Sequence, residues 1–248
     1  GYGRDGRPGP LQVHYGLLTV ARGCPVAVSV FEGNTADSLT FLPAVQRVRE
    51  RFGLAQVVMV GDRGMVSQKA IDELRGQGGI DWITALKSVS IRSLVEHGHL
   101  QLGLFDQRNL AEITSPDYPG ERLVACRNDA LAKLRAHKRE SLLQATEALL
   151  AVVQASVDAG RLTGQDKIGV QVGKIINRHK VAKHFELSIG EASLSWARRQ
   201  DAIDAEAALD GLYVIRTSLH AERMDAPGCV RSYKALSNVE RAFRSLKT

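Results

Sequence analysis

The chain has 248 residues, of which 44% are hydrophobic and 24% are charged, so it holds enough apolar material for a globular core. No apolar run approaches the roughly 20 residues that span a bilayer, which excludes a protein built on membrane-spanning helices. The formal net charge of +6 favours a polyanionic partner, and a basic protein without such a partner explains it about as well.

The cysteine pattern excludes two further classes of protein. Cys24, Cys126 and Cys229 are far apart and odd in number, and none of them belongs to a Cys-x-x-Cys pair. The sequence therefore supports neither a zinc site nor a disulfide framework. Reduced thiols in a cytoplasm fit this pattern best.

Strands and helices alternate in the first part of the chain. Residues 11–20 and 25–31 are rich in β-branched and apolar residues, and the Arg22-Gly23 turn between them predicts an antiparallel hairpin. The next predicted elements are a helix at 41–53, a strand at 55–60, a helix at 68–76 with Ser67 as its N-cap, and a strand at 79–87. Helical crossovers between strands predict parallel pairing here.

The pattern changes after residue 87. Residues 88–128 are expected to be irregular, apart from a strand with the sequence "RLVACR". The elements predicted after it are a long helix from Asp129 to Gly160, a helix at 166–179, a hairpin within 184–198, a short helix at 201–211, a strand at 211–219 and a last helix at 229–247.

This order of elements predicts a mixed α/β protein. Residues 1–87 and 210–248 are expected to form one α/β core. Residues 88–209 are expected to form a large α+β insertion between the last core strand and the last helix.

A carboxylate stands at the end of a predicted buried strand, in the segment "LAQVVMVGDRGM". Open α/β sheets place their chemistry at the carboxyl ends of strands, which is the position of Asp62. An isolated aspartate there more often starts a turn. Arg63 is more often a solvated surface residue, and Gly61 and Gly64 allow the backbone to turn sharply.

The last helix carries a second candidate carboxylate. At about 100° per residue, Tyr233, Glu240, Arg244 and Lys247 fall within roughly 60° of one another, beside the apolar stripe. An amphipathic helix with a stabilising Glu240–Arg244 pair has the same spacing. Convergence of Asp62 and Glu240 would instead create a site for Mg²⁺ or Mn²⁺, which serve phosphodiester chemistry.

These segments resemble the DDE transposases of bacterial insertion sequences, specifically the group with a Tyr-x₂-Arg-x₃-Glu-x₆-Lys helix. Tyr233, Glu240 and Lys247 match that spacing, whereas Leu236 stands where the family has arginine. The segments "VVMVGDRGM", "FEGNTADSLTF", "GYGRDGRPG" and "DGLYVIRTSL" are also similar to segments of the family. The resemblance covers most of the chain.

The resemblance implies an RNase H-like mixed-sheet core with the insertion before its last helix. It implies metal-dependent DNA cleavage and strand transfer at insertion-sequence ends, with Asp62 and Glu240 as catalytic ligands of two Mg²⁺ or Mn²⁺ ions. The residues expected to contact DNA are Tyr233, Lys247, Arg244 and Arg63. Double-stranded DNA is the implied partner, a homodimer the implied active form, and the bacterial cytoplasm, at the nucleoid, the implied location.

The resemblance also implies that one acid is missing. The first catalytic aspartate of the family precedes the loop that resembles "GYGRDGRPG", and neither Asp5 nor Asp37 is assigned as its substitute. We therefore expect a transposase truncated at its N-terminus and after Lys247. Such a chain carries two of three acids and should be weak or inactive in strand transfer.

Other interpretations stay open. A phosphatase of the haloacid-dehalogenase type shares "VGD" after an apolar strand, but Val66 stands where that family needs a further aspartate. An RNase H-like nuclease and a catalytically incomplete fragment that binds DNA also fit, while the spacing of the last helix favours the transposase. Four basic residues of the insertion either follow a DNA backbone or form a solvated helix face: Lys174, Arg178, Lys180 and Lys183.

Overall fold

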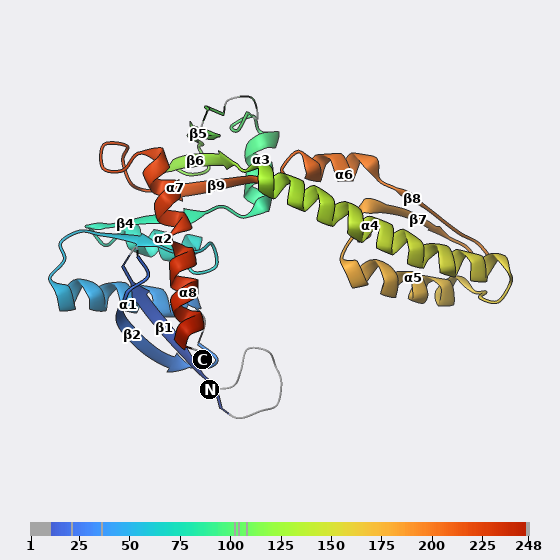
Figure 1. The fold of residues 1–248 in the computed structure, drawn as a ribbon, viewed down its shortest axis with the longest axis horizontal. Helices are drawn as coiled ribbons and strands as arrows, with labels where there is room; N and C mark the ends of the chain where they lie inside the picture. Colours follow the sequence, from blue (N-terminus) through green and yellow to red (C-terminus); the bar gives the residue numbers. More distant parts are fainter. Residues whose placement is uncertain are drawn as a thin grey trace. The chain divides into compact units, whose positions relative to one another are not determined.

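The structure is a computed structural model, and it describes residues 11–20, 22–35, 37–101, 103, 105–107 and 109–246 (Figure 1). Contacts divide the chain into two compact units. The first consists of Gly1–Arg127 with Tyr213–Thr248, and the second of Asn128–Leu212. In this division, residues 88–127 group with the first unit. The domain boundaries expected at 87 and 210 stay a prediction.

The first unit contains a hairpin and a mixed sheet. Its elements are β1 (Val13–Thr19), β2 (Pro25–Glu32), α1 (Asp37–Phe52), β3 (Val57–Val60), α2 (Gln68–Arg75), β4 (Ile80–Ala85), α3 (Ser88–Glu96), β5 (Leu110–Ile113), β6 (Arg122–Arg127), β9 (Leu212–Thr217), α7 (Ala226–Lys234) and α8 (Leu236–Leu246). Strands β1 and β2 pair as the predicted antiparallel hairpin, and the order of the five-stranded sheet is β3-β4-β9-β6-β5. Strand β3 is parallel to β4, whereas β4–β9 and β5–β6 are antiparallel. This mixed sheet confirms the predicted α/β class and is compatible with an RNase H-like core.

The apolar run of β3 packs on both faces of the sheet. Met59 contacts the buried cluster formed with α1 and α2, which includes Trp82 of β4. Val58 and Val60 pack against the cluster on the other face, which α7 covers together with Ile83. Alternating side chains therefore face two different helix layers, which explains why the strand carries no polar position.

The expectation that residues 88–128 are irregular apart from one strand was wrong. Helix α3 forms there and buries Ile91 and Leu94, while β5 pairs with β6 at the edge of the sheet. The stretch before α3 lacks an N-cap side chain, and β5 has only four residues, so neither gives a strong local signal.

The last helix also differs from its prediction. It begins at Ala226, earlier than expected, and is divided at Ala235 into α7 and α8. Helix α7 packs against strands β4, β5 and β6, whereas α8 lies against β1 of the hairpin (Figure 1). The two halves are therefore supported by different parts of the first unit.

The second unit is a helical hairpin combined with a β-hairpin. Its elements are α4 (Asp129–Asp158), α5 (Gln165–His179), a 3₁₀ turn (Ala182–His184), β7 (Phe185–Ile189), β8 (Leu194–Arg198) and α6 (Gln200–Ala207). The predicted long helix, the helix at 166–179, the hairpin and the short helix that follows it are all present. A separate buried cluster joins both hairpins, with Leu143, Leu150, Val172 and Phe185 among its members.

Among the described residues, none of the helices is long and apolar enough to cross a membrane.

Candidate catalytic site at the end of strand β3

Strand β3 ends in a tight turn that Asp62 stabilises. The N–H of Gly61 donates to the carbonyl of Ile83 at 3.1 Å, which extends the ladder to β4. A Cβ atom on Gly61 would lie 2.6 Å from Cγ2 of Val66, so this position accepts only glycine without a shift of Val66. Oδ1 of Asp62 accepts hydrogen bonds from the N–H groups of Gly64 and Met65, each at 2.8 Å.

The same aspartate keeps one oxygen available. Its side chain is exposed, and no described residue donates a hydrogen bond to Oδ2. Asp62 therefore starts a turn, as an isolated aspartate often does, and also presents a carboxylate oxygen to solvent at the carboxyl end of a parallel strand. A free carboxylate oxygen is a suitable ligand for a hard divalent cation.

Tyr233 of α7 lies close to this turn. The side chain packs partly buried against the core cluster on its face of the sheet. Its phenol pKa is raised, first by burial and then by the negative charge of Asp62, while the positive charge of Arg63 opposes the shift. Three of the predicted site residues, Asp62, Arg63 and Tyr233, are therefore within electrostatic reach of one another.

Glu240 and Arg244 lie further along, on α8. Their side chains are 71% and 81% exposed, and the carboxylate lies 3.6 Å from the guanidinium, as in the predicted helix-surface pair. Lys247 lies outside the described residues. Within the part of the chain that the structure describes, no group of three or more His, Cys, Asp or Glu side chains is arranged to hold a metal ion.

An arginine of the central sheet holds the chain just before α7. Nη1 of Arg122 donates to the carbonyls of Leu219 and Met224, at 2.9 and 3.0 Å. Its Nε and Nη2 donate to Oε2 of Glu112. Asp225 then caps the helix through the N–H of Gly228. These contacts fix where α7 begins, and therefore where Tyr233 points.

Sequence reasoning missed this anchoring, although one local signal was available. Asp225 followed two residues later by Pro227 is a typical helix start, and it predicts α7 from residue 226. The role of Arg122 has no such signal, because its two carbonyl partners are about 100 residues away in the chain.

A buried ion network lies beside the turn. The Glu121 side chain is 0% exposed and receives hydrogen bonds from Arg216 at 2.6 and 2.5 Å and from Arg75 at 2.7 Å. Arg216 also donates to Oε1 of Gln68 at 3.0 Å. Gln68 is the first residue of α2 and follows the N-cap Ser67, so the network ties the segment after the Asp62 turn to β9.

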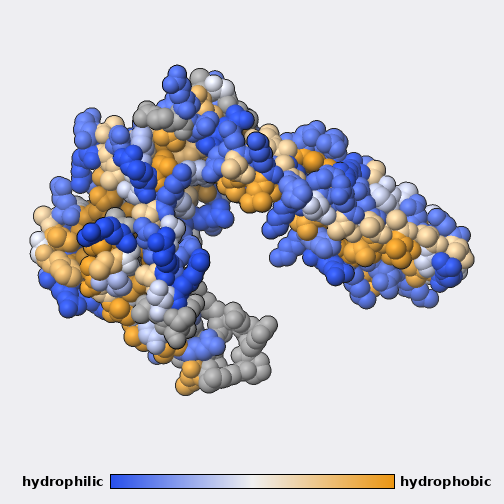
Figure 2. Space-filling view, in the orientation of Figure 1, coloured by the Kyte–Doolittle hydropathy of each residue, from blue (hydrophilic) through white to orange (hydrophobic). Residues whose placement is uncertain are grey.

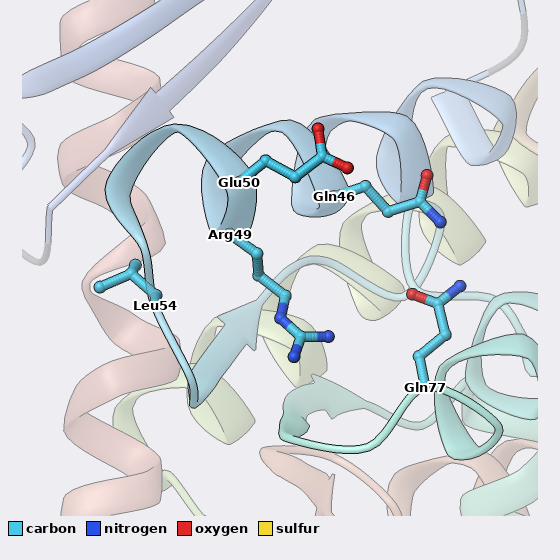
Figure 3. Close-up of a pocket in the computed structure, with 5 residues that line it drawn as sticks. All are labelled: Gln46, Arg49, Glu50, Leu54 and Gln77. Carbon is cyan, nitrogen blue, oxygen red and sulfur yellow. The ribbon is translucent and has the colours of Figure 1, made fainter.

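An open pocket lies at the other end of these strands. It is lined by Gln46, Arg49 and Glu50 of α1 together with Leu54 and Gln77 (Figure 3). Leu54 and Gln77 precede β3 and β4, so the pocket is at the amino ends of the two parallel strands. Because open α/β sheets place their chemistry at the carboxyl ends, we do not include this pocket in the candidate site.

Comparison with known proteins identifies the family of the chain. A family model described as transposase DDE domain matches residues 5–248, which is nearly the whole chain. Neither the curated proteins nor the solved structures contain a match. Since the family model covers far more than half of the sequence, the chain belongs to the DDE transposase family.

Proposed function

We propose that this protein is a transposase that cleaves DNA and transfers the new strand ends, using divalent cations held by Asp62 and Glu240. The observation that carries the proposal is the match of the DDE transposase domain over residues 5–248. The open oxygen of Asp62 at the end of β3 supports it independently of the family. The implied substrate is double-stranded DNA, and a homodimer on paired transposon ends is the proposed active form.

The residues around Asp62 suit phosphate chemistry in complementary ways. A tyrosine hydroxyl is protonated at neutral pH, and the raised pKa of Tyr233 strengthens this preference, so the hydroxyl can donate a hydrogen bond to a phosphate oxygen. Arg63 is exposed and adds a positive charge beside the turn. When bound, Mg²⁺ or Mn²⁺ would activate the attacking oxygen and stabilise the leaving one. Lys247 and Arg244 are proposed contacts to the DNA backbone.

The test uses two substitutions that preserve local structure. In Asp62→Asn the amide Oδ1 still accepts the two backbone hydrogen bonds, so the turn is kept while the negative charge is lost. Glu240→Gln changes an exposed side chain on the helix surface. We expect both variants to lose Mn²⁺ binding, measured by calorimetry, and any Mn²⁺-stimulated nicking of supercoiled plasmid.

A matched control is Asp201→Asn on α6, which removes one exposed carboxylate from the second unit. This variant should bind Mn²⁺ and nick DNA like the parent chain. Unchanged Mn²⁺ affinity in both Asp62→Asn and Glu240→Gln would reject a shared metal site. DNA binding without Mn²⁺-dependent nicking in the parent chain would favour a DNA-binding protein that does not catalyse the reaction.

A further inference from the structure

The carboxylates of α4, the longest helix of the second unit, gather on one side of the helix. On α4 the four carboxylates are Asp129, Glu140, Glu147 and Asp158, and at 100° per residue they lie within about 20° of one another. Glu140 and Glu147 bind Arg198 of β8, so this acidic stripe faces the β7–β8 hairpin. All the carboxylates of α4 therefore lie on one side of the helix.

The cations Arg135 and Lys138 lie on the opposite side of α4. They are about 140° and 160° around the helix from Glu140, and both are exposed. Neither side chain forms an ion pair with any residue that the structure describes. Two positive charges therefore remain unneutralised on the side of α4 that faces away from β8.

Helix α5 also carries exposed cations on the side that faces away from the β7–β8 hairpin. Nε2 of Gln165 donates to the carbonyl of Ile189 at 3.0 Å, which identifies the side of α5 that faces β7. Lys167, Lys174 and Arg178 lie about 140° or more from Gln165 around the helix, and all three are exposed. They also make no ion pair within the described residues. We call the surface formed by these three residues with Lys138 the outward helix face. Arg135 is not part of it, because it shares the helix angle of Val153, which packs against the buried cluster.

One of the four basic residues of the insertion that the sequence singles out does not contribute an unpaired charge. Lys183 pairs with Glu206, so its charge is already neutralised. Exposed apolar residues border the outward helix face: Leu134, Val152 and Val170. Figure 2 shows hydrophilic residues bordering an apolar area on the part of the second unit formed by α4 and α5. Scattered exposed apolar side chains are common on protein surfaces and do not by themselves indicate a protein partner.

We propose that the outward helix face binds the phosphate backbone of duplex DNA without reading its sequence. The inference rests on the proposed function, because DNA is the polyanion that a transposase meets. Lys167 and Arg178 are separated by roughly 17 Å along the axis of α5. A DNA strand carries one phosphate per about 3.4 Å of helix axis, so this length spans several phosphates. Unpaired cations on neighbouring helices suit such a contact, since binding releases counterions from the DNA.

The test measures DNA affinity in EDTA, where catalysis does not contribute. Fluorescence anisotropy of a labelled 30-base-pair duplex is recorded for the full chain at several NaCl concentrations. The double variant Lys138→Ala/Arg178→Ala removes two charges from the outward helix face. We expect its affinity to fall about tenfold, and the slope of log affinity against log salt to decrease by about 1.8.

The control removes the same number of charges elsewhere in the unit. The control is the double variant Lys133→Ala/Arg161→Ala. Lys133 lies about 20° from Glu140, on the acidic stripe of α4, and Arg161 lies in the loop before α5. This double variant should keep its affinity within about twofold and its salt slope unchanged. Circular dichroism would verify that both variants fold.

Equal losses in the two double variants, or no loss in the first, would overturn the inference. Its outcome is separate from that of the proposed function. Suppose that Asp62→Asn keeps Mn²⁺-dependent nicking while Lys138→Ala/Arg178→Ala loses DNA affinity. This result would support the proposed DNA surface and reject the proposed metal site. If the Asp62 and Glu240 variants lose Mn²⁺-dependent nicking while Lys138→Ala/Arg178→Ala keeps its DNA affinity, the result would support the proposed metal site and reject the proposed DNA surface.

Discussion

Each of the two units joins a strand to its other elements through arginine–carboxylate pairs, but the two units bury these charges to different extents. In the first unit, Glu121 is completely buried between Arg216 and Arg75. In the second unit, Arg198 binds Glu140 and Glu147, whose side chains are 46% and 23% exposed.

The difference changes what the same chemistry contributes. A carboxylate removed from water is costly, and its guanidinium partners offset that cost only while every hydrogen bond is made. A partly solvated pair is screened by water and contributes little to stability. The buried network therefore specifies one arrangement of α2, β9 and the loop before β6. The exposed network contributes little to the stability of α4, which its apolar face already holds in place.

The largest expected effect comes from breaking the buried network. Glu121→Ala leaves Arg216 with an uncompensated buried charge, and we expect the free energy of unfolding of the first unit to fall by about 3–5 kcal/mol. Urea unfolding followed by circular dichroism would measure this loss. Glu121→Gln keeps an acceptor oxygen and should cost less. A loss below about 1 kcal/mol for Glu121→Ala would contradict the view that this network fixes the arrangement.

The corresponding change in the second unit should be smaller. Arg198→Ala exposes two carboxylates that water already reaches, so we expect a loss of about 1 kcal/mol in the same measurement. High salt screens exposed pairs more than buried ones. In 1 M NaCl the effect of Arg198→Ala should therefore shrink, while that of Glu121→Ala persists. Equal salt sensitivity of the two variants would remove the distinction between the networks.

A still smaller effect should depend on pH. His184 is 2% exposed, and burial lowers its pKa, although the nearby carboxylate of Glu206 opposes the shift. The folded protein therefore favours the neutral imidazole more strongly than the unfolded chain does. As the pH falls below about 6.5, the His184 ring binds a proton more readily in the unfolded chain than in the folded protein, so the free energy of unfolding decreases.

The pH effect is measured by urea unfolding at pH 7.5 and pH 5.5. The parent chain should be less stable at the lower pH, and His184→Gln should reduce that difference. The charged neighbours Lys183 and Arg139 both disfavour the protonated ring and remain in the variant. A pH dependence that is unchanged in His184→Gln would assign it to other groups.

The smallest effect is expected at the candidate site itself. The Glu240–Arg244 pair is exposed and spaced i,i+4, so its coupling energy should be only about 0.3–0.5 kcal/mol. A double-mutant cycle with Glu240→Gln and Arg244→Gln, read by thermal unfolding, would measure it. A coupling above about 1 kcal/mol would mean that Glu240 supports the fold, and loss of activity in its variant could then reflect instability.

Local patterns predicted much of this fold. The hairpin of β1 and β2, the parallel pair β3–β4 and the long α4 all follow from side-chain periodicity and turn residues. Helix α3 and β5 were missed because each is short and lacks a distinct start signal. The contacts of Arg122, Arg216 and Glu121 join residues about 50 to 150 positions apart, and no local pattern encodes such pairs.

The candidate site was predictable to a similar extent. The position of Asp62 at the exit of an apolar strand follows from the sequence. The stripe predicted for Tyr233 and Glu240 assumes one continuous helix, whereas the structure places these residues on the separate helices α7 and α8. The use of one Asp62 oxygen within the turn does not follow, because it depends on backbone geometry after the strand. The metal-binding roles of Asp62 and Glu240 stay predictions, as does the DNA contact of Lys247.

The division of the last helix at Ala235 has a mechanical consequence. Helix α7 is clamped to the central sheet, whereas α8, which carries Glu240, rests on the hairpin. Gly23 in the hairpin turn has φ of +82°, and a Cβ atom there would lie 2.9 Å from Cβ of Asn238 on α8. The position of Glu240 therefore depends on packing against the hairpin, whereas the position of Asp62 depends on the central sheet, so the two candidate acids are supported by different parts of the first unit.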